Sequence, residues 1–186
     1  MGTNVLFLDF DDVICLSQPF GAYDAMLAMR GIDSGTESLE AHAELWAQLF
    51  VPEAVAHLKE IHNEFELTFV LSTSWIKFLT QESLICIMRQ SGLSFVADSL
   101  HEDWSSTRSQ SGGVRANEIR SWLDRNPGFE DRWVILDDLH SGTGLDVWNE
   151  TEQSFITLCK VGVGLTEVES NHLRKGLQRR WEVACA

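Results

Sequence analysis

The segment NVLFLDFDDV, residues 4–13, is an apolar run that ends in a cluster of carboxylates. A short run that is apolar throughout is typical of a strand covered on both faces, as in a parallel sheet. We therefore expect a strand over Asn4–Leu8. In an open α/β sheet, ligands bind beyond the carboxyl ends of the strands. Asp9, Asp11 and Asp12 therefore fall where a site is expected.

Four more apolar runs predict further strands of the same sheet. They lie at Leu67–Leu71, Phe95–Ala97, Trp133–Leu136 and Phe155–Leu158. Segments with helical spacing of apolar residues separate these runs. They lie after Pro52, around Leu84–Met88, around Ile119–Leu123 and after the capping-box pair Thr166 and Glu169, where Leu173, Leu177 and Trp181 share one face. Strands that alternate with helices indicate a layered α/β sheet with right-handed crossovers.

Two longer segments depart from this alternation. Cys15–Val51 is too long for a strand-to-helix loop, and it contains weak helical patterns over Ala22–Met29 and Leu39–Phe50. We interpret it as a small helical insertion beside the end of the first strand. Glu102–Gly113 is rich in Ser, Gly and Thr, which favours a mobile surface loop.

Composition narrows the classes of function. The 186 residues carry 28 acidic and 14 basic side chains, a formal net charge of −14. This charge opposes extensive non-specific binding to nucleic acid or anionic lipid. No apolar run approaches the roughly 18 residues of a membrane span, and the N-terminus has no basic region of a secretory signal. The four cysteines form no CxxC pair. These features predict a cytoplasmic protein with reduced thiols.

A second acidic pair, Asp137-Asp138, closes the fourth predicted strand and points to the same sheet edge as Asp9 and Asp11. Clustered carboxylates repel one another unless they share a proton or bind a divalent cation. A hard cation that takes oxygen ligands and leaves room for phosphate indicates Mg²⁺. One aspartate after a strand is commonly a turn former or a helix cap. Two acidic groups, each closing an apolar strand, favour a site.

Candidate phosphate-binding groups lie at two further places. Ser72 and Thr73 follow the second strand, where a hydroxyl can donate to a phosphoryl oxygen. Arg115 begins the helix that leads to the fourth strand, and its planar guanidinium can bind phosphate through two nitrogens. Arg108 and Arg120 compete for this role. Each of these residues alone also fits an ordinary turn or a solvated surface.

Together these segments resemble the haloacid dehalogenase-like (HAD) superfamily of hydrolases and phosphatases. Its four motifs are similar to Asp9-x-Asp11-x-Val13, the hydroxyl of Leu71-Ser72-Thr73, Arg115 and Asp137-Asp138. The similarity is closer to the HAD domains of predicted RNA-repair proteins and their stand-alone bacterial relatives. The segments VLFLDFDDVI, FVLSTSW, EIRSWL followed by WVILDD, and VGVGLTEVE carry it. The resemblance spans nearly the whole chain.

The resemblance implies a fold and a set of roles. The fold is one HAD-like domain over residues 1–186, a Rossmann-like three-layer α/β sandwich. Its mainly parallel five-stranded sheet has the order 5-4-1-2-3, and residues 15–51 take the cap position. Asp9 would be the nucleophile, and Asp11 would protonate the leaving oxygen and then deprotonate the hydrolytic water. Mg²⁺ would be held by Asp9, the backbone carbonyl of Asp11, and Asp137 or Asp138.

The phosphoryl group would be bound by Ser72 or Thr73, which the sequence does not separate, and by Arg115. Two positions depart from the family pattern. Asp12 stands where phosphatase members usually have glycine, and Arg115 stands where they usually have lysine.

These features predict an Mg²⁺-dependent phosphohydrolase that cleaves a phosphate monoester through an aspartyl-phosphate intermediate. The substrate would be a phosphorylated small molecule, a nucleotide or a nucleic-acid end. Two alternatives remain. One is a receiver-like signalling domain, in which Asp98, after the third predicted strand, would accept the phosphate. The other is a non-catalytic binding module that keeps the HAD fold.

Overall fold

The computed structural model describes residues 4–106, 113–146 and 148–184, with only the backbone for 181–184. Within them, five strands form one sheet in the order β3-β2-β1-β4-β5, and every neighbouring pair is parallel. The strands are β1 (Val5–Leu8), β2 (Thr68–Leu71), β3 (Leu100–Ser105), β4 (Trp133–Asp138) and β5 (Ile156–Cys159). This confirms the predicted strand order and the Rossmann-like α/β fold.

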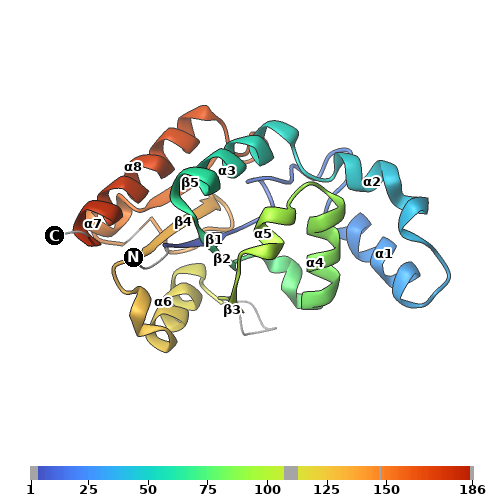
Figure 1. The fold of residues 1–186 in the computed structure, drawn as a ribbon, viewed down its shortest axis with the longest axis horizontal. Coiled ribbons are helices and arrows are strands. Elements are labelled where there is room, and N and C mark those ends of the chain that lie inside the picture. Colours follow the sequence, from blue (N-terminus) through green and yellow to red (C-terminus); the bar gives the residue numbers. More distant parts are fainter. Residues whose placement is uncertain (1–3, 107–112, 147, 185–186) are drawn as a thin grey trace.

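Helices cover both faces of the sheet (Figure 1). Helices α3 (Pro52–Phe65) and α8 (Glu167–Ala184) lie side by side over one face, and α6 (Arg115–Arg125) lies over the other. Phe7 of β1 packs against Trp122 of α6, with ring centroids 5.1 Å apart. Each residue of β1 is fully buried, as expected for the central strand of a three-layer sandwich.

The predicted helix starts agree with the structure. Pro52 occupies the first turn of α3, where its missing N–H costs nothing. Before α8, the backbone N–H of Thr166 donates to the carboxylate of Glu169 at 3.2 Å, and the hydroxyl of Thr166 accepts the N–H of Val168 at 3.2 Å. Leu173 and Leu177 of α8 are buried. The side chain of Trp181, predicted on the same face, is not among those that the structure describes. The other helices are α4 (Gln81–Gln90), α5 (Ser94–Asp98), α7 (Glu150–Gln153), and the 3₁₀ turns η2 (Ser74–Lys77) and η3 (Pro127–Phe129).

The segment between β1 and α3 is the expected helical insertion. It contains α1 (Ala22–Asp33), η1 (Leu39–His42) and α2 (Ala43–Gln48). The N–H of Val51 donates to the carbonyl of Ile14 at 2.8 Å, so the insertion leaves and rejoins the core at one place. In Figure 1, α1 and α2 lie beside α4, at the end of the molecule far from both termini.

The predicted third strand is wrong. Phe95–Ala97 lies in α5, and the chain enters the sheet later, as β3. A three-residue apolar run does not distinguish a short helix from a strand. The sequence of β3, LHEDWS, gives no continuous apolar signal because this edge strand is only partly buried.

The expected loop over Glu102–Gly113 is also wrong in its first part, since 102–105 belong to β3. Residues 107–112 lie outside the described residues. No helix in the described ranges is long and apolar enough to cross a membrane. Cys15, Cys86 and Cys159 are free, and Cys185 is not among the described residues.

Candidate active site

The acidic residues after β1 and at the end of β4 converge at one sheet edge. The two strands run in register, with Leu8 opposite Leu136, and the N–H of Asp9 donates to the carbonyl of Leu136 at 3.0 Å. Asp9, Asp137 and Asp138 each place one carboxylate oxygen within 4.8 Å of the others. All three side chains are buried. Sheet register therefore brings together groups that are far apart in the chain.

Several oxygens of this acidic cluster, defined as Asp9, Asp137 and Asp138, have no hydrogen bond. They are both oxygens of Asp9 and one oxygen each of Asp137 and Asp138, all buried. The remaining oxygens accept backbone N–H groups, for Asp137 from Asp138 at 2.9 Å, and for Asp138 from His140 at 2.6 Å and Ser141 at 3.0 Å. Buried carboxylate oxygens without partners are costly. A hard divalent cation with oxygen ligands, such as Mg²⁺, fits this donor set.

Burial also changes the protonation of the acidic cluster. It raises the pKa of Asp9 well above its usual value, and the nearby charge of Asp137 raises it further. Burial raises the pKa of Asp137 to about 7, although the guanidinium of Arg115 opposes the change. The metal-free acidic cluster therefore retains protons near neutral pH, and a bound cation would displace them.

The carboxylate of Asp11 accepts hydrogen bonds from the turn that follows β2. The indole N–H of Trp75 lies 3.0 Å from each Asp11 oxygen, and the hydroxyl of Ser74 donates to one of them at 3.3 Å. Burial raises the pKa of Asp11, and the two hydrogen bonds lower it. Trp75 is fully buried. The sequence favoured packing over substrate contact for Trp75, and nothing in the pattern shows where the indole N–H points.

Asp12 occupies a backbone conformation that favours glycine, the residue that the resemblance leads one to expect there. Its φ is +54°, in the left-handed region that side chains rarely adopt. Its carboxylate accepts the N–H of Gly162 at 2.7 Å, which ties the loop after β1 to the loop after β5. At Gly164, a Cβ atom would lie 2.8 Å from the carbonyl oxygen of Val13, so the two loops approach closely.

Ser72 and Thr73 follow β2 and are both fully buried, but their hydroxyls have different surroundings. The Ser72 hydroxyl accepts from Arg115 at 3.2 Å and from Ser106 at 2.9 Å. The Thr73 hydroxyl instead accepts the N–H of Trp75 at 3.4 Å and caps η2. The hydroxyl beside the arginine is therefore that of Ser72.

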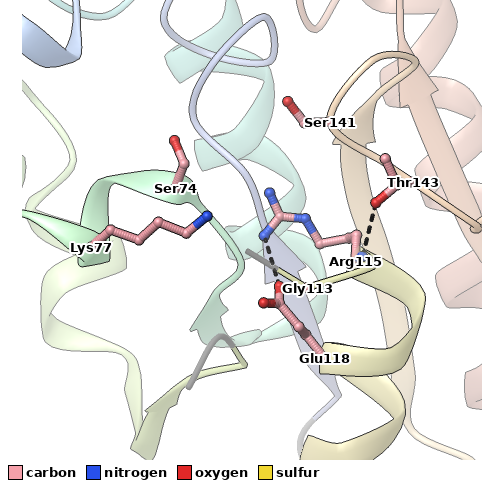
Figure 2. Close-up of a pocket in the computed structure, with 7 residues that line it drawn as sticks. All are labelled: Ser74, Lys77, Gly113, Arg115, Glu118, Ser141 and Thr143. Atoms are coloured by element: carbon pink, nitrogen blue, oxygen red, sulfur yellow. Dashed lines mark hydrogen bonds and ion pairs between the residues drawn. The ribbon is translucent and has the colours of Figure 1, made fainter. Parts of the chain in front are cut away.

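Arg115 is the first residue of α6, and its backbone N–H donates to the hydroxyl of Thr143 at 3.0 Å (Figure 2). Its guanidinium is buried among three carboxylates. Nε lies 3.0 Å from Asp137 without hydrogen-bond alignment, and the terminal nitrogens lie 3.7 Å from Asp9 and 3.9 Å from Glu118. The arginine thus joins the end of β1 to the end of β4.

Arg108 and Arg120 were the competing candidates for phosphate binding. The guanidinium of Arg120 lies over the ring of Trp148, 4.6 Å from its centroid. Arg108 lies outside the described residues.

A polar cavity of about 200 Å³ opens beside Arg115. Its lining residues are Ser74, Lys77, Gly113, Arg115, Glu118, Ser141 and Thr143. Figure 2 shows Ser74 and Lys77 on one side of Arg115, and Ser141 and Thr143 on the other. None of these residues belongs to the insertion. The sequence did not predict Lys77, Glu118 or Ser141 as site residues, since no motif marks them.

Comparison with protein families places the chain in a described family. The model described as the HAD domain in Swiss Army Knife RNA repair proteins matches residues 5–169, which include the acidic cluster, Asp11, Ser72 and Arg115. Searches of curated proteins and of solved structures each gave no significant match.

Proposed function

This chain belongs to the HAD domains of Swiss Army Knife RNA repair proteins, and on that basis we propose that it is an Mg²⁺-dependent phosphohydrolase of phosphate monoesters. The observation that carries the proposal is the convergence of Asp9, Asp137 and Asp138, in which both oxygens of Asp9 and one oxygen each of Asp137 and Asp138 are buried without a hydrogen bond. We further propose that residues 1–186 form one HAD-like domain, in which 15–51 are a small cap.

Asp9 is the proposed nucleophile. Its carboxylate attacks phosphorus and forms an aspartyl-phosphate as the bond to the leaving oxygen breaks, which divides one difficult displacement into two easier ones. Arg115 lies 3.7 Å from Asp9 and beside the Ser72 hydroxyl, and both would hold phosphoryl oxygens. Thr73 is left with a capping role.

Mg²⁺ would be held by the carboxylates of the acidic cluster and the backbone carbonyl of Asp11. When bound, it neutralises charge on the phosphoryl oxygens. The raised pKa of Asp9 in the metal-free protein supports a need for Mg²⁺, because the nucleophile acts only when its carboxylate is deprotonated.

Asp11 is the proposed general acid and base. It gives its proton to the leaving oxygen in the first step and takes a proton from water in the second. That water attacks phosphorus, inorganic phosphate leaves, and the Asp9 carboxylate is restored. The raised pKa of Asp11 favours the protonated form that the first step needs. Ser74, which donates to Asp11, also lines the cavity beside Arg115, which supports a place for the acid near the proposed substrate site.

The favoured substrate is a phosphorylated nucleic-acid end, because the matching family is described from RNA repair proteins. The net charge of −14 disfavours long backbone contacts, which agrees with recognition of an end. Nucleotides and phosphorylated small molecules are the competing substrates.

The receiver-like alternative loses its phosphate acceptor in this fold. Asp98 ends α5 rather than a strand, is exposed, and pairs with Arg89 at 2.9 Å. The third strand in chain order, β3, is followed by Ser106 and not by an aspartate that could accept the phosphate.

Hydrolysis of an aryl phosphate tests the proposal. Purified protein should release phosphate with Mg²⁺, lose this activity in chelator, and lose it again in the Asp9→Asn variant. Asp98→Asn is the matched control, since it removes an exposed carboxylate far from the acidic cluster in sequence. Activity that survives in Asp9→Asn would reject the nucleophile. Binding of phosphate without turnover would instead favour the non-catalytic module.

A further inference from the structure

The cavity beside Arg115 contains a second cation that the proposed hydrolysis does not use. Arg115 is buried and already shared among Asp9, Asp137 and Glu118. Lys77 is exposed, and no described carboxylate lies within ion-pair distance of its amino group. Arg115 therefore lies deep in the cavity, and Lys77 stands at the mouth with its charge available.

The backbone turn that contains Lys77 also contacts Asp11. Ser74 and Lys77 are the first and last residues of η2, a single 3₁₀ turn in which side chains three residues apart point the same way. Ser74 at its start donates to Asp11, and Ser74 and Lys77 both line the cavity. The fully buried Trp75 anchors the turn between them. Lys77 is thus held on the side of the proposed leaving-group acid.

The size and polarity of the cavity limit what it encloses. Its volume of about 200 Å³ is below the roughly 300–1,000 Å³ of sites that enclose drug-sized ligands. A phosphoryl group and the first atoms of its leaving group fit, while the rest of the substrate remains outside. Among the described residues, no aromatic or aliphatic side chain lines the cavity, so these residues offer no surface on which a base or an apolar ring would stack. Recognition near the mouth depends on charge and hydrogen bonds.

We propose that Lys77 binds a second phosphate on the leaving group. The preferred substrates then carry a terminal phosphate monoester and a neighbouring phosphate, as in a nucleoside bisphosphate or a phosphorylated oligonucleotide end. This inference rests on the proposed function and narrows its substrate class. Because the protein is strongly acidic, one unpaired cation at the mouth offsets repulsion that a substrate with two phosphates would otherwise meet.

The test compares substrates that differ only in the second phosphate. Nucleoside 3′,5′-bisphosphate is compared with the 3′- and 5′-monophosphates, and dinucleotides phosphorylated at either end form a second arm. Wild-type kcat/KM should be about tenfold higher for the substrates with two phosphates. Lys77→Gln should remove most of this preference, and Lys77→Arg should keep it. Lys59→Gln, an exposed lysine of α3 outside the cavity, should leave it unchanged.

Salt dependence gives an independent readout. The plot of log kcat/KM against log salt should become less steep in Lys77→Gln for the substrates with two phosphates, because screening by salt then weakens one fewer attraction. A merely structural effect of the substitution would lower all rates together without changing this slope.

The two arms and a binding experiment separate the possible outcomes. Preference for bisphosphate and dinucleotide alike supports a nucleic-acid end, and preference for bisphosphate alone supports a small nucleotide with the same chemistry. Equal loss on all substrates in Lys77→Gln, or no wild-type preference, overturns the inference. If no aryl phosphate is hydrolysed, the proposed function fails. In that case, calorimetric affinities test the role of Lys77 separately from hydrolysis. Wild type should bind nucleoside bisphosphate more tightly than monophosphate, and Lys77→Gln should lose this difference.

Discussion

Replacement of Asp137 by Asn should stabilise the metal-free protein at alkaline pH. The substitution keeps the shape of the side chain and removes one buried charge from the acidic cluster. Burial raises the pKa of Asp137 from 3.8 to about 7 in the folded protein. A carboxyl whose pKa is raised on folding contributes stability below its unfolded pKa, and this contribution is lost as pH rises through the folded value.

The size of the effect follows from that pKa. A difference of this size corresponds to at most about 4 kcal/mol once the group is fully ionised. Arg115, 3.0 Å from Asp137, loses a charged partner in the variant, which offsets part of the gain. We expect a net stabilisation of about 2 kcal/mol, which for a chain of this length raises Tm by roughly 4–8 °C.

Thermal unfolding followed by circular dichroism measures this effect. In chelator at about pH 8, Asp137→Asn should melt above wild type, and at about pH 4 the difference should nearly vanish. Added Mg²⁺ should raise the Tm of wild type and have little effect on the variant, because a ligand is missing. Asp98→Asn, at an exposed position, should match wild type within about 0.5 kcal/mol. A variant less stable than wild type at about pH 8, or equally stabilised by Mg²⁺, would refute the reasoning.

Two further substitutions test the loops around the acidic cluster. Trp75→Phe removes the N–H that donates to Asp11 but keeps an aromatic ring against Phe10. Hydrolysis of alkyl phosphates, which need the acid, should slow about tenfold more than hydrolysis of aryl phosphates; equal slowing would contradict the positioning role. Gly164→Ala places a Cβ atom 2.8 Å from the carbonyl oxygen of Val13, at a φ of +78°. It should lower stability by about 1–3 kcal/mol in a thermal melt, whereas an unchanged Tm would show that the two loops separate easily.

The fold was predictable where burial on both faces leaves a continuous apolar signal. The central strands β1, β2 and β4 were found within two residues at each end. The edge strand β3 was missed because its residues are only partly buried and its sequence is mostly polar. The short apolar run Phe95–Ala97, predicted as the third strand, lies in α5. The error is confined to the strand with the least burial.

The candidate site divides in the same way. Asp9, Asp137 and Asp138 were expected to meet because the carboxyl ends of parallel strands share one edge, and register alone brings them together. Ser72 and Thr73 were not separable, since both follow the same strand. Which hydroxyl faces Arg115 depends on the turn that begins there, and the sequence pattern does not give the geometry of that turn.

The turn that follows β2 links most of the proposed chemistry. Within Ser72–Lys77, one hydroxyl contacts Arg115, the next caps η2, and Ser74 and Trp75 hold Asp11. Trp75 also stacks on Phe50, which lies at the end of the insertion, with ring centroids 6.1 Å apart. The insertion contributes no residue to the cavity, and this ring contact is one route by which it can influence the general acid. A change in the insertion that displaces Phe50 should therefore act like Trp75→Phe, on the leaving group more than on phosphate binding.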